Sequence, residues 1–215
     1  MRKAVQLYAV FGVLSLLPCQ ALAQKGWSVQ TATTVGTNTN IVHVQAGWPG
    51  ISATLLHGYT PTVDIGGIFT FNYGYEGDVN LVHPGLKGQF LVRAQLMDTP
   101  KYNLGLWFAP GGFVYFFSDP VNTLGGIVFP AGLVFGLPVT HEVNISFNFD
   151  LPMFVSFGTY GQFTVPILFG GGVEYFLQPD MALTFNLRMG PIIYTKSGAG
   201  TDFDLQALFG LAFKL

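Results

Sequence analysis

Apolar and polar side chains alternate along the C-terminal part of this 215-residue chain. In the last segment, residues 203–215, every odd-numbered position is apolar, while the even-numbered positions include Asp204, Gln206 and Lys214. A period of two residues puts the two sets on opposite faces of a β-strand, whereas a helix would spread both around its circumference. The pattern therefore predicts strands and not helices.

The same period, followed backwards along the chain, predicts ten strands. Their ranges are 39–48, 51–59, 64–73, 85–97, 102–117, 123–137, 142–157, 164–177, 181–194 and 203–215. The range 51–59 is ambiguous, and 102–117 and 123–137 are apolar on both faces, so periodicity alone does not orient them. The last four ranges all exceed the roughly 9–11 residues with which a strand crosses a bilayer.

Short and longer connections alternate between these ranges. Residues 59–62, 98–101, 138–141 and 178–180 are tight turns rich in Pro, Asp and Thr, and 74–84, 118–122, 158–162 and 195–202 lie between them. An even number of strands then puts both chain ends at the end of the tight turns. Trp48-Pro49-Gly50 is an unusually short connection at the opposite end. Residues 24–38 are either a tail or an extra strand, so twelve strands is the higher alternative and eight the lower.

Composition restricts where such strands can lie. Only 9% of the residues are charged, against about 25% in soluble domains, and the mean hydropathy is +0.45. Beyond residue 24 no apolar run reaches 18 residues, and the nearest, 124–139, contains four glycines and two prolines. A closed barrel makes every backbone hydrogen bond between strands, which suits lipid. We expect an all-β fold, a transmembrane antiparallel up-and-down barrel of about ten strands.

The N-terminus has the three parts of a secretory signal peptide. Arg2 and Lys3 precede an apolar stretch at 4–17, and small residues at 21–23 predict cleavage after Ala23. A retained anchor, or lipidation at Cys19, is the alternative, but Pro18 fits neither well. The expected organisation is a signal peptide at 1–23, the undecided segment 24–38 and a barrel at 39–215.

Cleavage would remove the single cysteine and two of the nine basic residues, leaving seven against eleven acidic ones. Disulfide and thiolate chemistry are then excluded in the mature chain. No basic run is present, so nucleic acid is not an expected partner. No motif for a cofactor occurs either, since the mid-strand glycines 170–172 lack the lysine and helix of a phosphate loop.

Two segments resemble a known superfamily. Gly58-Tyr-Thr-Pro-Thr-Val-Asp-Ile-Gly-Gly67 resembles a hairpin turn that recurs in small Gram-negative outer-membrane β-barrel proteins, and the aromatic-rich last strand is similar to their C-terminal assembly signal. The chain departs from that signal in ending on Leu215 and not on Phe. The resemblance implies a bacterial outer-membrane location, lipid contact and recognition by the barrel-assembly machinery. It implies no catalytic motif, and it leaves the oligomeric state open.

Charged side chains on the inward faces form a predicted polar cluster in the lumen: Lys87, Arg93, Asp150, Glu174 and Arg188. With hairpins centred near residues 160 and 179, Asp150 lies opposite Gly170, and Gly170 lies opposite Arg188. Strands are about 4.8 Å apart, so Arg188 reaches over the glycine to a carboxylate about 10 Å away. The pair either fills a narrow barrel or forms a charged constriction that controls the passage of solutes.

Three aromatic residues share the predicted inner face of the range 102–117: Trp107, Phe113 and Tyr115. They face the small residues of 126–136, as large residues do in a packed interior. An apolar lumen pocket for a lipid-like molecule is the alternative.

Catalysis and metal binding have weaker candidates. Glu76, Asp78 and His83 share one loop, where an Asp–His pair could activate water. His43 and His57 lie on separate strands, with no third ligand evident. We therefore expect a non-enzymatic structural protein or narrow passive pore, without cofactor or metal. The alternatives are an enzyme acting on lipid or peptide at the outer face, a carrier of an apolar molecule, and a soluble periplasmic β-sandwich or lipocalin-like binder.

Overall fold

The protein is described here from a computed structural model, which describes residues 26–74, 76, 83–118, 121–157, 161–195 and 201–215. These residues form twelve strands: β1 (Asn40–Trp48), β2 (Gly50–Thr60), β3 (Val63–Asn72), β4 (Gly85–Asp98), β5 (Asn103–Phe108), β6 (Gly111–Ser118), β7 (Val121–Pro138), β8 (Val143–Ser156), β9 (Phe163–Pro166), β10 (Leu168–Gln178), β11 (Met181–Tyr194) and β12 (Thr201–Lys214). The expected cleavage site, in residues 1–25, lies outside the described part.

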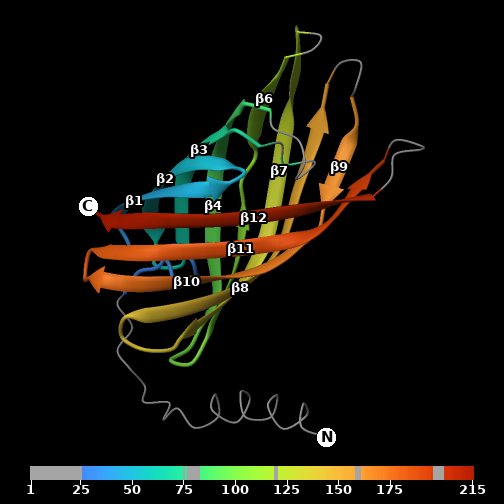
Figure 1. Cartoon of the computed structure of the whole chain (residues 1–215). Coiled ribbons are helices and arrows are strands. Elements are labelled where there is room, and N and C mark those ends of the chain that lie inside the picture. The colour runs from blue at the N-terminus through green and yellow to red at the C-terminus, as the bar shows by residue number, and fades with distance from the viewer. Residues whose placement is uncertain (1–25, 75, 77–82, 119–120, 158–160, 196–200) are drawn as a thin grey trace, which may run out of the picture.

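The strands close into a single antiparallel barrel (Figure 1). Strands β1 to β4 pair in sequence order, as do β7 with β8 and β11 with β12, and β12 pairs with β1, which closes the circle. Strands β5 and β6 both lie between β4 and β7, and β9 and β10 both lie between β8 and β11. The twelve strands therefore occupy ten positions around the barrel wall, and each position is called a stave below. This confirms the predicted barrel and its strand count.

Two predicted strands are interrupted by proline. The range 102–117 divides at Ala109-Pro110 into β5 and β6, and the range 164–177 divides after Pro166 into β9 and β10. Proline has no N–H to give to a ladder, so pairing lapses at these points. The amide next to each proline still bonds to the neighbouring strand. Ala109 N donates to the Pro130 carbonyl, and Ile167 N donates to the Pro191 carbonyl.

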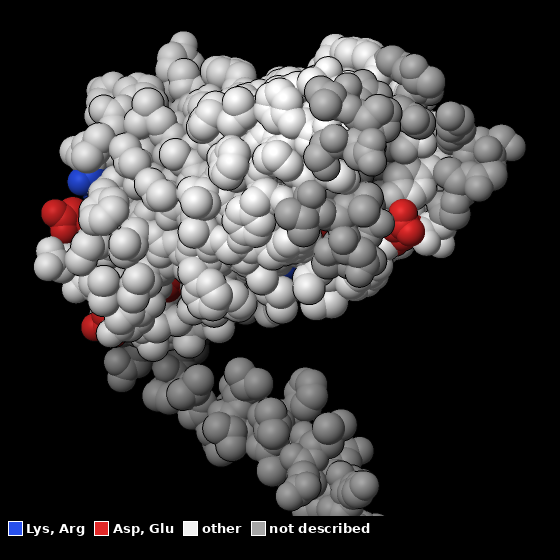
Figure 2. All heavy atoms as spheres, turned by 45° about the horizontal axis from the view of Figure 1, so that its top comes forward, with Lys and Arg blue, Asp and Glu red and all other residues white. Residues whose placement is uncertain are grey.

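The outer surface is apolar. Large hydrophobic side chains on every stave are exposed, among them Leu55, Phe69, Phe90, Phe147, Phe169 and Phe209. Figure 2 shows a wall with few charged side chains, most of which lie near its ends. Exposed apolar area of this extent, continuous around a barrel, is the surface that lipid tails cover and water does not.

Inward positions alternate with these exposed ones in the predicted phase. His43 in β1, Asp64 in β3, Arg93 in β4, Asp150 in β8 and Asn186 in β11 are all buried. The ambiguous strand β2 turns Thr54 and Leu56 inward. In the described residues no helix is long and apolar enough to span a membrane.

The barrel is shorter on one side than on the other. Strand β1 has 9 residues and only Pro49 joins it to β2, whereas β7 has 18 residues. At about 3.3 Å per residue along the strand, β7 is about twice as long. The tight turns and Leu215 lie at one end, here called the turn end, and the opposite end is called the loop end.

The segment that precedes β1 corrects the prediction for residues 24–38. Its described part contains no strand and does not extend away as a tail. It folds into the turn end of the lumen, where Trp27, Ser28, Ala32 and Val35 are all at most 2% exposed. We call residues 27–35 the plug. The sequence pattern gave no sign of it, because its burial depends on a wall that other segments build.

Candidate functional site in the barrel lumen

A buried carboxylate on β10 holds the beginning of the plug. Glu174, fully buried, accepts hydrogen bonds from Ser28 Oγ at 2.6 Å, from the Val29 amide at 2.9 Å and from Asn144 Nδ2 at 3.0 Å. The strand alternation turns this side chain inward, and the plug has no strand partner for its amides. Glu174 therefore supplies the acceptor that a buried N–H requires.

An ion pair on the opposite wall holds the end of the plug. Arg93 Nη2 lies 2.6 Å from Asp64 Oδ2, and the same carboxylate accepts the Val35 amide at 3.1 and 3.2 Å. The guanidinium also donates to the carbonyl oxygens of Ser28, Thr31 and Thr33. The pair is thus satisfied by backbone on both sides, as a buried ion pair must be.

Neutral side chains complete the attachment. Asn103 Oδ1 accepts the Ala32 amide at 2.9 Å, and Asn186 Nδ2 donates to Gln30 Oε1 at 3.1 Å. Trp27 donates its indole N–H to the Pro179 carbonyl and packs edge-on against Phe176, with ring centroids 5.0 Å apart. Thr34 Oγ1 also donates to the Pro61 carbonyl at 2.9 Å. The plug is therefore bonded to β3, β4, β5, β10 and β11 and to two tight turns.

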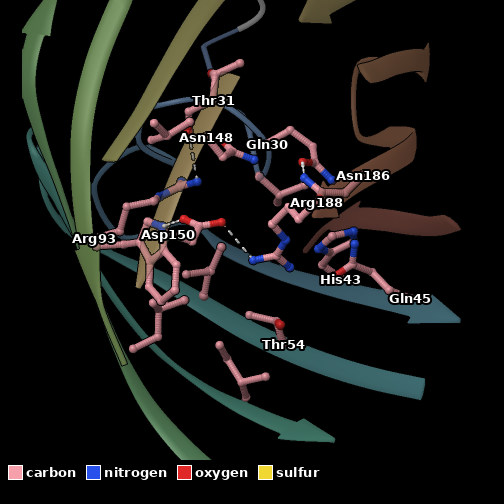
Figure 3. Close-up of a pocket in the computed structure, with 16 residues that line it drawn as sticks. Gln30, Thr31, His43, Gln45, Thr54, Arg93, Asn148, Asp150, Asn186 and Arg188 are labelled. Atoms are coloured by element: carbon pink, nitrogen blue, oxygen red, sulfur yellow. Dashed lines mark hydrogen bonds and ion pairs between the residues drawn. The ribbon is translucent and has the colours of Figure 1, made fainter. Parts of the chain in front are cut away.

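Above the plug, a second ion pair joins β8 to β11 across the intervening β10 (Figure 3). Arg188 Nη1 lies 3.1 Å from Asp150 Oδ2, and Trp107 Nε1 donates to the other carboxylate oxygen at 3.2 Å. Gly170 pairs with Arg188 as predicted, but Asp150 pairs with Leu168 and not with Gly170. The hairpin between β8 and β9 turns one residue earlier than supposed, which shifts the pairing by two.

Two adjoining cavities occupy the lumen between the plug and the loop end. The inner one has a volume of about 160 Å³ and the outer one about 140 Å³. Plug residues Val29, Gln30 and Thr31 form part of the inner cavity's lining. Five residues line both cavities: Gln45, Thr54, Ile68, Trp107 and Arg188.

The outer cavity has its own charged pair. Lys87 Nζ bonds to Glu76 Oε1, and Asn72 Nδ2 donates to both Glu76 Oε1 and the Tyr115 hydroxyl. Of the five predicted cluster residues, Lys87, Arg93 and Glu174 therefore have other partners, and only Asp150 and Arg188 pair with each other.

Two of the three predicted inner-face aromatic residues lie in a packed interior, and the alternative, an apolar pocket, does not form beside them. Phe113 and Tyr115 pack with Leu124, Val128 and Phe154 into a cluster, and the cavity beside them has a volume of about 10 Å³. That is room for about one water molecule. Trp107 lies apart from this cluster and lines the two polar cavities instead.

Of the residues considered for catalysis and metal binding, the four that the structure describes each have a different partner. Glu76 is held by Lys87, the His83 ring packs against Phe117 at 4.3 Å, and Asp78 lies outside the described residues. His43 Nε2 bonds to the Thr184 hydroxyl, and His57 Nδ1 to Asn40 Oδ1. The described part of the chain contains no group of three or more His, Cys, Asp or Glu that could hold a metal ion.

Four residues that matter in the lumen were not singled out in the sequence: Gln30, Asp64, Asn103 and Asn186. Asp64 and Asn186 had the inward phase of their strands, so a search for every polar inward position would have found them. Asn103 begins a strand that is apolar on both faces, and Gln30 belongs to a segment without periodicity.

No protein-family model matches the sequence, and no curated protein matches it. Among solved structures the chain is similar to outer membrane protease OmpT from Escherichia coli, at 10% identity and a TM-score of 0.48, over 89% of this chain and 100% of that one. It is also similar to a chain from "Unveiling the Mechanism Behind the in-meso Crystallization of Membrane Proteins", at 14% identity and a TM-score of 0.36, over 82% of each chain. Neither likeness carries an activity or a site over to this protein.

Proposed function

We propose that this protein is a non-enzymatic outer-membrane barrel whose lumen is closed by its own N-terminal plug. In the resting state it acts as a structural membrane protein and not as an open pore. The observation that carries the proposal is the set of buried hydrogen bonds by which Glu174, Asp64 and Asn103 hold residues 28–35 inside the barrel.

The outer surface supports the membrane location. Aromatic and aliphatic side chains cover the outside of every stave, while ion pairs and amides line the inside. The tight turns and both ends of the described chain lie at the turn end of the barrel. In outer-membrane barrels the short turns face the periplasm, so this arrangement fits such a barrel. The assembly machinery would then recognise β12, whose exposed Phe203, Phe209 and Phe213 face lipid.

Charge pairing supports closure. In an open aqueous pore, water would solvate Arg93 and Asp64, but here both side chains are at most 6% exposed and bonded to plug backbone. Removing the plug would take from this ion pair the Val35 amide and the carbonyl oxygens of Ser28, Thr31 and Thr33. The closed state is therefore the stable one.

Electrical recording in planar lipid bilayers tests closure. The chain that begins at Gln24 should show no steady conductance, and a variant that lacks residues 26–36 should show single-channel steps. Altered migration in SDS before and after boiling would verify that the deletion variant still forms a barrel. If that variant does not fold, the double variant Glu174→Ala, Asn103→Ala should show brief openings instead. Steady conductance of the intact chain would refute closure.

The absence of enzymatic activity is part of the proposal. The intact protein is expected to leave lipid and peptide substrates unchanged, as is a His83→Ala variant. Turnover that the His83→Ala variant loses would instead favour the enzyme alternative.

A further inference from the structure

The two lumen cavities have the size of a small ring molecule. At about 160 and 140 Å³ they compare with an engineered cavity of about 150 Å³ that accepts benzene. Because five residues line both cavities, the two lie side by side above the plug and are treated together as one space. The plug forms the floor of this space, and the outer cavity lies on its loop-end side.

The lining of this space is balanced in charge. Each of its cations is already paired with a carboxylate: Arg188 with Asp150, Lys87 with Glu76, and Arg93 with Asp64. Glu174 is turned to the plug and does not line either cavity. A charged ligand would have to displace a counter-ion or enter without one, and both are costly in a buried site. The lining therefore favours a neutral ligand.

Amides and hydroxyls make up much of the remaining lining, including Gln45, Thr54, Asn148, Gln89 and Thr70. Side-chain amides and hydroxyls offer both donors and acceptors. A hydroxyl group also donates and accepts, so a ligand that carries several hydroxyls matches this lining.

Trp107 gives this polar space one apolar surface. Its indole N–H is held by Asp150, and the ring lines both cavities. A fixed aromatic ring beside amides and hydroxyls suits a ring molecule with an apolar face and a polar edge.

From these observations we propose that the lumen above the plug binds a small neutral polyhydroxylated molecule of the size of a monosaccharide. The ligand enters from the loop end and rests on Gln30 and Thr31 of the plug. Gln45 and Trp107 contact it from opposite sides of the shared lining. This site goes beyond the closed barrel proposed above, because a closed barrel needs no ligand.

Calorimetry and Trp fluorescence on the detergent-solubilised mature protein test the site, with glucose, glucuronate and glucosamine as probes. We expect saturable binding of glucose and binding about tenfold weaker for the anionic and cationic sugars. The glucose-induced change in fluorescence should vanish in Trp107→Phe and persist in Trp48→Phe.

Gln45→Leu, which keeps the size of the side chain and removes its amide, should bind glucose about tenfold less tightly. Ala46→Val, one residue along and on the lipid face, should bind as the parent protein does. The proposal is overturned if no sugar binds saturably, if glucuronate binds as tightly as glucose, or if Gln45→Leu leaves affinity unchanged. The conductance of the intact chain tests closure separately, so either proposal can fail alone.

Discussion

Buried acceptors on the barrel wall decide where the plug lies. Glu174, Asp64 and Asn103 each accept a backbone N–H from a segment that has no strand to pair with. An unpaired amide in this place would cost about 1–3 kcal/mol, so each acceptor stabilises one position of the plug. The carboxylate of Glu174 also accepts hydrogen bonds from the side chains of Asn144 and Ser28.

Glu174→Gln should destabilise the folded protein by about 1–3 kcal/mol, because the new amide presents a donor to Ser28 or Val29, which need an acceptor. Urea unfolding in lipid vesicles measures the change. Glu142→Gln, at the exposed turn before β8, is the matched control and should alter stability little. Equal stability of the two variants would show that Glu174 does not hold the plug.

The plug, as an element, fits the lumen because both partners are small. Its residues 31–35 are Thr, Ala and Val, and the wall beside them has glycine at 105, 136 and 172. A Cβ on Gly105 would lie 2.8 Å from that of Ala32, and one on Gly172 would lie 2.6 Å from Gln30 Oε1. These glycines make room for the segment, which explains positions that strand propensity alone would disfavour.

A single cysteine at Ala32 should resist a water-soluble maleimide in the folded protein and react after denaturation, because residue 32 is fully buried. Gly26→Cys, at the exposed start of the described chain, should react in both states. The mature chain expected from cleavage after Ala23 has no other cysteine, so labelling reports one site. Fast labelling of Ala32→Cys in the folded protein would show that the segment leaves the lumen.

The whole molecule reverses the arrangement of a soluble protein, with hydrogen-bonded polar groups inside and apolar side chains outside. The hairpin of β1 and β2 shows this within a short length. Val44, 43% exposed, lies halfway along β1, and Tyr59, 63% exposed, lies near the turn end of β2. If lipid covers this surface, a charge should cost most at the middle of the hairpin.

Val44→Arg should reduce the free energy of unfolding in phospholipid vesicles by about 2–4 kcal/mol, and Tyr59→Arg should reduce it by about 0–1 kcal/mol. The measurement is reversible unfolding in urea followed by Trp fluorescence. Similar costs at both positions would argue against a membrane around this hairpin.

Much of the barrel was predictable from local order. The alternation along 142–157 and 181–194 placed Asp150 and Arg188 inside, and the tight turns gave the count of ten staves. The two proline interruptions were not anticipated, although Pro110 and Pro166 are visible in the sequence. The alternation of apolar and polar side chains does not report which residues lack an N–H group. Where strand pairing is interrupted is seen only from the neighbouring strands.

The lumen was predictable only in part. That Arg188 reaches past Gly170 followed from the pairing of one hairpin, but the exact partner of Asp150 depended on where another hairpin turns. A shift of one residue at the turn moves a partner by two along the strand. Such shifts leave the facing of every side chain unchanged, so the alternation pattern cannot detect them.

By itself the sequence determined which side of most strands faces outward, because that property repeats every two residues and needs no knowledge of distant segments. It left 51–59, 102–117 and 123–137 without an orientation, since their two faces do not differ enough. Only the tertiary structure decided what fills the barrel. The plug, the ion pair of Arg93 with Asp64 and the two cavities arise from groups far apart in the chain. Their contacts exist only once ten staves have closed around a common axis.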